Sequence, residues 1–120
     1  MEEIGIESTV LKQIFEGNKT VEGRLGKAKF LKLKVGDSLQ LREDVWENGS
    51  IIKSIPNQGI IRITQILYFV SFREMLESLD IESILPTVKS LDEAIATYHT
   101  FYTPEDEAEY GVVAFTFKYS

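Results

Sequence analysis

The stretch Gly17-Asn18-Lys19-Thr20-Val21-Glu22-Gly23-Arg24 joins a predicted helix to the first predicted strand. Three charged side chains of mixed sign, Lys19, Glu22 and Arg24, crowd this junction, where the interior of a small domain would place apolar residues. The stretch therefore decides how the chain enters its sheet, and it is where we expect a functional site.

The segments on either side of this stretch predict a short helix followed by a strand. Ser8 is a suitable N-cap and Gly17 suits the position after a last helical turn. Between them apolar side chains recur at helical spacing, namely Val10, Leu11, Ile14 and Phe15. Residues 20–25 then have the composition of a strand.

The middle of the chain predicts a meander of strands. Residues 38–42 alternate polar and apolar side chains, as a half-buried strand does. Asn48-Gly49 is a strong hairpin signal. Two β-branched runs follow, at residues 51–55 and 60–70, separated by a turn at residues 56–59.

The last third predicts helices and a closing strand. Ser71 and Ser90 are each followed three residues later by a glutamate, which is the capping-box pattern of a helix start. Pro104 suits the first position of a further helix, and residues 112–119 alternate as a strand. The order of elements predicts an α+β fold: one domain over residues 1–120, built as a small β-barrel of about five to six strands with three to four short helices.

Composition excludes several classes of protein. The 120 residues include no cysteine, which rules out disulfides, zinc knuckles and thiol catalysis and is typical of the cytoplasm. His99 is the single histidine, so a multi-histidine metal site is impossible and neither a metal nor a cofactor is expected. No apolar run approaches the roughly 20 residues of a membrane span, and the acidic N-terminus differs from a signal peptide.

Charge is distributed unevenly along the chain. Residues 19–42 contain seven basic and two acidic side chains, a local charge of +5, whereas the whole chain carries −6 and the remainder therefore −11. A cationic face of this kind attracts phosphates even on an acidic protein. The alternative is that outward lysines protect strand edges and maintain solubility. The lysines concerned are Lys27, Lys29, Lys32 and Lys34.

Strand parity places two charges of the junction together. In a strand over residues 20–25, Glu22 and Arg24 point to one side and Val21 and Leu25 to the other. Lys19 precedes the strand, where the backbone is free to turn it toward the same cleft. A carboxylate between two cations stays ionised, and exposed donors of both cations would suit a phosphate or a base edge. The alternative is an ion-pair network that closes one end of the barrel.

Four motifs resemble one known family. Residues 17–24 match the G-x-K-x-x-E-x-R signature of the ASCH (activating-signal-cointegrator homology) family, whose domains have a PUA-like β-barrel. Residues 33–37, residues 68–76 and the closing segment with Tyr102, Glu107 and residues 110–115 are similar to the family pattern in the same order. The resemblance covers nearly the whole chain. It implies a cleft beside the first strand that binds RNA or a nucleotide-like ligand.

One branch of ASCH-like proteins implies an enzymatic alternative. Its members are small N(4)-acetylcytidine amidohydrolases, in which a lysine base activates a threonine three residues later. Lys19 matches the lysine, but Glu22 occupies the position of the threonine, and Thr20 has the wrong offset. A carboxylate is a poor replacement for an activated hydroxyl, although Glu22 could act as a general base for water.

A few further residues are candidates of a weaker kind. The family pattern brings Tyr68 near the cleft, whereas the other aromatic side chains of the last half favour a core role over base stacking. His99 is expected to have a surface or packing role. The acids at residues 105–109 are expected to form the solvated start of a helix. Trp46 near the hairpin is either a lid or a recognition aromatic.

Three functional hypotheses follow. The first is a binding module for RNA or a nucleotide-like ligand, with Lys19, Glu22, Arg24 and Tyr68 in the cleft and the four lysines on backbone phosphate. The second is a hydrolase acting on a modified nucleoside such as an N(4)-acylcytidine, or on RNA, with Lys19 and Glu22 transferring protons. The third is a protein-interaction domain whose acidic helical face binds a basic partner.

Overall fold

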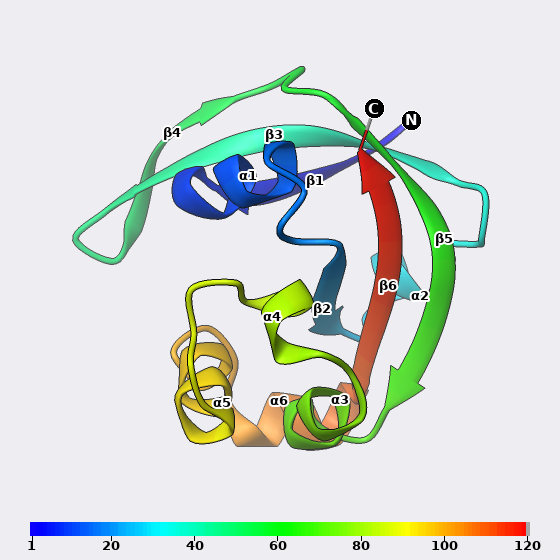
Figure 1. The fold of residues 1–120 in the computed structure, drawn as a ribbon, viewed down its shortest axis with the longest axis vertical. Coiled ribbons are helices and arrows are strands. Elements are labelled where there is room, and N and C mark those ends of the chain that lie inside the picture. The colour runs from blue at the N-terminus through cyan, green and yellow to red at the C-terminus, as the bar shows by residue number, and fades with distance from the viewer. Residues whose placement is uncertain (120) are drawn as a thin grey trace.

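A curved six-stranded sheet and six helices make up the part of the chain that the computed structural model describes, residues 1–119 (Figure 1). The strands are β1 (Glu2–Glu7), β2 (Val21–Leu25), β3 (Ser38–Glu47), β4 (Ser50–Ile55), β5 (Ile60–Phe69) and β6 (Val112–Tyr119). The helices are α1 (Ser8–Phe15), α2 (Ala28–Leu31), α3 (Phe72–Ser78), α4 (Ile81–Ile84), α5 (Leu91–His99) and α6 (Pro104–Tyr110). None of these helices is long and apolar enough to cross a bilayer.

The sheet is mixed and runs in the order β1-β3-β5-β6-β2, with β4 paired to the free part of β3. Strand β1 runs parallel to β3, and every other pairing is antiparallel. Within residues 1–119 no ladder joins β1 to β2, the two ends of this order. The predicted α+β fold is confirmed, and the predicted barrel takes the form of a curved sheet that backbone pairing leaves open.

Local sequence signals explain most of these elements. Asn48 and Gly49 both have positive φ, 52° and 79°, as the β3–β4 hairpin turn requires. The Ser71 hydroxyl accepts a hydrogen bond from the Glu74 amide at 3.0 Å and caps α3. Helix α5 starts in the same way at Ser90. The N-caps predicted at Ser71 and Ser90 are therefore confirmed, whereas the N-cap predicted at Ser8 is wrong, because Glu7 caps α1.

Three elements were not predicted: β1, α2 and α4. Strand β1 buries Ile4 and Ile6 on one face, and these two isoleucines are its only apolar side chains, which makes the alternation of a strand short. Helices α2 and α4 have four residues each and sit within connections. Six helices replace the three to four expected, and four of the six have seven or more residues.

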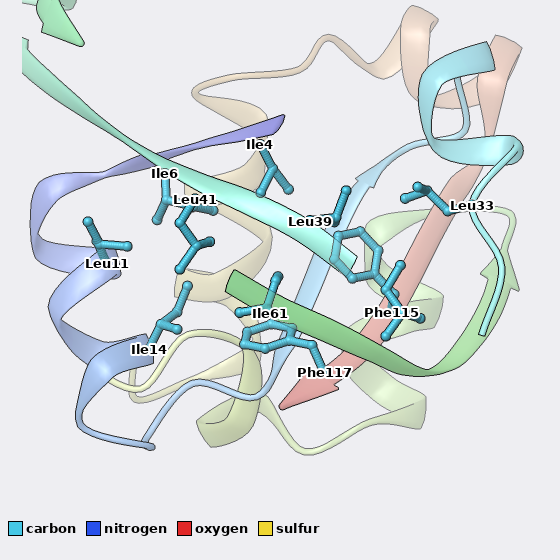
Figure 2. Packing of buried hydrophobic residues seen from close by; sticks show 11 residues of the cluster. Ile4, Ile6, Leu11, Ile14, Leu33, Leu39, Leu41, Ile61, Phe115 and Phe117 are labelled. Atoms are coloured by element: carbon cyan, nitrogen blue, oxygen red, sulfur yellow. The ribbon is translucent and has the colours of Figure 1, made fainter. Parts of the chain in front are cut away.

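Two separate hydrophobic clusters hold the fold. The first packs α1 and the inner face of β1, β3 and β5 against β6, as Figure 2 shows with Ile4, Leu11 and Phe117. The second packs β2 and β6 against α3, α4 and α5, around Phe72, Met75 and Tyr98. The space between the two clusters lies beside β2, which positions the charged stretch at their junction.

Candidate ligand-binding cavity beside β2

Glu22 is a buried carboxylate held between two cations. Its Oε1 lies 3.4 Å from the Lys19 Nζ, and its Oε2 lies 3.3 Å from the Arg24 Nη2. Burial raises the pKa of Glu22, but the charges of Lys19 and Arg24 outweigh burial and hold that pKa below its usual range. Glu22 is therefore ionised at neutral pH and acts only as a hydrogen-bond acceptor.

Lys19 faces inward and its ammonium is fully occupied. The side chain belongs to a residue only 2% exposed, and the Nζ donates to the carbonyls of Val21, at 2.8 Å, and Ile84. Glu22 provides the third acceptor. Burial lowers the pKa of Lys19, against the attraction of Glu22. The expectation that Lys19 offers exposed donors to a phosphate is thus wrong: Lys19 ties β2 to the end of α4 and positions Glu22.

Arg24 is more open and keeps unused donors. Its Nη2 donates to the Gly5 carbonyl at 2.8 Å and to Glu22, and its guanidinium carbon lies 5.5 Å from the centre of the Phe30 ring. The Glu22 carboxylate raises the pKa of Arg24 against the effect of burial. Within residues 1–119 no partner is recorded for the Nε or Nη1 hydrogens of Arg24. These hydrogens remain able to bind an acceptor on a ligand.

A cavity of about 210 Å³ opens beside these charges. Lys19, Glu22 and Arg24 form one wall, and Ile6, Glu7 and Val10 come from the end of β1 and the start of α1. Leu85, after α4, and the aromatic side chains of α5 and its C-terminal extension complete the lining. The prediction that the three charges of the junction share one cleft wall is confirmed.

Tyr98 contributes an unsatisfied hydroxyl to this cavity. The residue is buried on α5, its ring stacks on Phe72 at 4.3 Å, and its hydroxyl proton has no acceptor among the described residues. Burial raises the pKa of Tyr98 well above its usual value, and the negative charge of Glu22 adds to the effect. The hydroxyl therefore stays protonated, and a buried hydroxyl without a partner costs about 1–3 kcal/mol.

Trp46 and Phe101 form the outer edge of the cavity. Their rings meet edge to face, 5.9 Å apart at an interplanar angle of 72°. Both side chains also line an outer groove of about 560 Å³ that includes Glu47 and Thr100. The two aromatic residues therefore lie between the cavity and the groove. The two roles predicted for Trp46, a lid or a recognition aromatic, stay predictions.

The structure does not bring the remaining predicted residues into the cavity. Tyr68 is 60% exposed on β5 and is not part of the lining. The four exposed lysines surround α2, where Lys29 donates to the Glu3 carbonyl and Lys32 pairs with Glu2 at 3.3 Å. Glu2 and Glu3 begin β1, whereas the cavity lies at the end of β1. The lysines thus form a separate basic surface.

Sequence reasoning missed several lining residues. Glu7 is the N-cap of α1, where its carboxylate accepts hydrogen bonds from Thr9 and Val10, and no motif indicates this role. Tyr98 has the core role predicted for it and also lines the cavity, whereas the core role predicted for Phe101 is wrong, because Phe101 is exposed. Phe101 follows the apolar stripe of α5, where the end of a helix exposes its last residues. This position is the only sequence signal that could have indicated that Phe101 is not part of the core.

Solved structures with the same fold include two of similar sequence. A hypothetical protein, PH0355, has a TM-score of 0.84 and 33% identity, with 100% of both chains covered. PF0455 from Pyrococcus furiosus has a TM-score of 0.75 and 35% identity, covering 98% of this chain and 96% of that one. EF3133 from Enterococcus faecalis V583, at 15% identity and a TM-score of 0.58 over 93% of this chain and 67% of that one, shares the fold alone.

These likenesses define a small α+β domain. The sequence model of the ASCH domain matches residues 4–119. The chain therefore belongs to the ASCH family, within the PUA-like superfamily, and the resemblance noted from the four motifs is confirmed. A search among curated proteins finds no match.

Proposed function

We propose that this ASCH domain binds RNA or a nucleotide-like ligand in the cavity beside β2. The observation that carries the proposal is the ionised Glu22, which Lys19 and Arg24 fix at the wall of a cavity that also contains aromatic rings. Hydrogen-bonding groups placed on a mostly apolar, concave surface are typical of small-ligand sites. Aromatic faces and an arginine are also the groups that recognise unpaired bases.

The basic surface around α2 extends the proposal to longer RNA. Lys27, Lys29, Lys32 and Lys34 are exposed and would contact backbone phosphates outside the cavity. Arg24 links the two regions, because it lines the cavity and its guanidinium also lies over Phe30 of α2. The cavity would then hold the recognised group, and the lysines would add affinity that depends on salt.

The geometry favours binding over the hydrolytic alternative. A general base works best with a pKa near the working pH, and the pKa of Glu22 is lowered. Lys19 donates to two backbone carbonyls, so its nitrogen is engaged with the main chain and is not directed at a substrate as a base. Thr97 also lines the cavity, but its hydroxyl is not placed as a nucleophile, because it donates a hydrogen bond to the Glu93 carbonyl at 2.8 Å.

Calorimetric titration with short single-stranded RNAs and with nucleoside monophosphates tests the proposal. Binding is expected at low salt, weakening as salt rises, with a smaller salt slope when the four lysines become glutamine. Glu22→Gln should weaken binding of every ligand, whereas Glu105→Gln on the exposed start of α6 should not. Failure of RNA, nucleosides and nucleotides alike to bind at low salt would overturn the proposal.

A further inference from the structure

We propose that Trp46 and Phe101 are the specificity-determining residues of this site. They stack on the ring of an uncharged, amino-bearing heterocycle that enters the cavity, and the cavity excludes phosphate. This inference rests on the proposed function and names the part of a nucleotide-like ligand that the cavity recognises. The ring could belong to a free nucleoside or to an unpaired residue of an RNA.

The charges around the cavity cancel. Lys19 and Arg24 are opposed by Glu22 and Glu7, so the lining carries two formal charges of each sign. The Lys19 ammonium is enclosed by its three acceptors and is not available to an anion. A phosphate placed against Arg24 would also face the ionised Glu22 carboxylate, and repulsion in a poorly solvated site is costly. The cavity therefore suits a neutral group.

The polar groups of the cavity form a mixed donor and acceptor set. Glu22 accepts, and the free Nε and Nη1 hydrogens of Arg24 donate. The Tyr98 hydroxyl has no acceptor for its proton among the described residues and can donate to a ligand. A heterocycle that carries an amino group next to a ring acceptor presents the complementary set. Its amino group would donate to Glu22, while its ring nitrogen or carbonyl would accept from Arg24 or Tyr98.

The size of the cavity limits the group that enters. Pockets for drug-sized ligands measure about 300–1,000 Å³, and this cavity measures about 210 Å³. One ring system fits, whereas a complete nucleotide does not. The remainder of the ligand would lie in the adjoining groove of about 560 Å³, beyond Trp46 and Phe101.

The aromatic pair is placed to contact the ring as it enters. Trp46 is 39% exposed and Phe101 is 59% exposed, and both line the cavity and the groove. Because the two rings meet edge to face, at 72°, ring surface is left free for a planar ligand. Stacking on such a surface selects flat rings without selecting charge. The pair therefore explains an exposed tryptophan that the packing of the core does not require.

Trp46 is the only tryptophan of the chain, so its fluorescence reports directly on stacking. The probes are cytidine and adenosine, which carry an amino group, uridine, which does not, and ribose 5-phosphate, which has no base. We expect cytidine or adenosine to quench the fluorescence and bind at least about tenfold more tightly than uridine, a difference of one good hydrogen bond. Ribose 5-phosphate should neither bind in the cavity nor compete.

Variants test the two aromatic residues, with binding followed by calorimetry. Trp46→Ala and Phe101→Ala should each weaken cytidine or adenosine binding by roughly 5- to 150-fold, the range for loss of one stacking contact. Trp46→Phe should retain most of the affinity. Phe15→Ala is the matched control, because Phe15 is 41% exposed and does not line the cavity. Unfolding curves confirm that each variant is folded.

RNA oligomers separate the two sources of the ring. If an oligomer binds and loses affinity when one residue is made abasic, the ring belongs to RNA, and if only nucleosides bind, the ligand is a free nucleoside. Either result supports the inference. Uridine binding as tight as that of both cytidine and adenosine, competition by ribose 5-phosphate, or full affinity in both alanine variants would overturn it while leaving the proposed function intact. Failure of every base-containing ligand to bind would instead overturn the proposed function itself.

Discussion

Arg24 on β2 donates a hydrogen bond of 2.8 Å to the carbonyl of Gly5 on β1, and so connects the two strands that end the sheet order. Backbone pairing leaves these strands apart within residues 1–119. The same guanidinium holds Glu22 and faces the cavity. One side chain therefore closes the sheet and presents the candidate site, which couples stability to binding.

Replacement of Arg24 is expected to open this connection. Arg24→Ala removes the bond to Gly5 and one of the two cations that hold the buried Glu22, so we expect a loss of roughly 2–3 kcal/mol in the free energy of unfolding. Arg24→Lys keeps the charge but cannot reach both acceptors with one planar group, and should lose about half as much. Urea unfolding at neutral pH measures both. Equal stability of the wild type and Arg24→Ala would show that Gly5 and Glu22 do not depend on Arg24.

The charge of Glu22 predicts an acid-dependent loss of stability. Its pKa in the folded state lies below the ordinary value of 4.5. The ionised form therefore stabilises the fold above about pH 4.5, and that contribution is lost as the pH falls through the lowered pKa. Glu22→Gln should cost about 3–5 kcal/mol at pH 7, because two buried cations lose their counter-charge.

Unfolding of both proteins across a pH series checks this expectation. The stability difference between wild type and Glu22→Gln should shrink as the pH is lowered below about 4.5, since the protonated carboxyl resembles the amide. Glu105→Gln, on an exposed turn, should change stability by no more than about 0.5 kcal/mol throughout. A difference that stays constant down to pH 3 would mean that Glu22 is not held as an ion.

Local patterns were sufficient to predict the parts of the fold that local chemistry determines. Ser71 caps α3, Asn48-Gly49 makes the hairpin turn and residues 112–119 form β6. The pairing of Glu22 with Arg24 followed from strand parity. Long-range contacts could not be predicted in this way. Lys19 is held in the interior by a hydrogen bond that its Nζ donates to the carbonyl of Ile84, 65 residues later, and nothing near Lys19 in the sequence indicates that partner.

The start of α1 shows that prediction from local sequence can fail even for a helix cap. Ser8 has a good N-cap side chain, yet Glu7 is the cap and its carboxylate accepts from the Thr9 and Val10 amides. The reason is β1, which holds the chain extended through Glu7 and shifts the cap by one residue. Because β1 pairs in parallel with β3, more than 30 residues later, local preference at Ser8 is overridden by the sheet.

Gly23 is expected to tolerate no side chain, because β2 packs tightly there against α3. A Cβ at this position would lie 2.7 Å from the Met75 Sδ and 3.1 Å from the Tyr98 Oη. Met75 is fully buried, so Gly23→Ala should destabilise the protein by about 1–3 kcal/mol through overpacking. In the double variant Gly23→Ala, Met75→Ala, the new methyl group fills part of the space that Met75 leaves. The loss in the free energy of unfolding of the double variant should therefore be at least about 0.5 kcal/mol smaller than the sum of the losses of the two single variants. Additive costs in urea unfolding would contradict this contact.

The prediction that the acids of α6 form a solvated face is wrong for Glu107. Its Oε2 accepts a hydrogen bond of 2.6 Å from the amide of Phe72 at the start of α3, and its Oε1 lies 3.1 Å from the Nε2 of His99 at the end of α5. The carboxylate thus joins three helices below the second hydrophobic cluster, and His99 has the packing role predicted for it.

Removal of this carboxylate should loosen the three helices together. Glu107→Ala leaves the Phe72 amide without its acceptor in a partly buried position, so we expect a loss of about 1–3 kcal/mol. Glu105→Ala, two residues earlier and exposed, should cost at most about 0.5 kcal/mol. Amide hydrogen exchange locates the effect: in Glu107→Ala the amides of α3 and α5 should exchange faster while those of β3 and β5 are unchanged. Uniform acceleration across both hydrophobic clusters would show that Glu107 stabilises the whole domain instead of its helical layer.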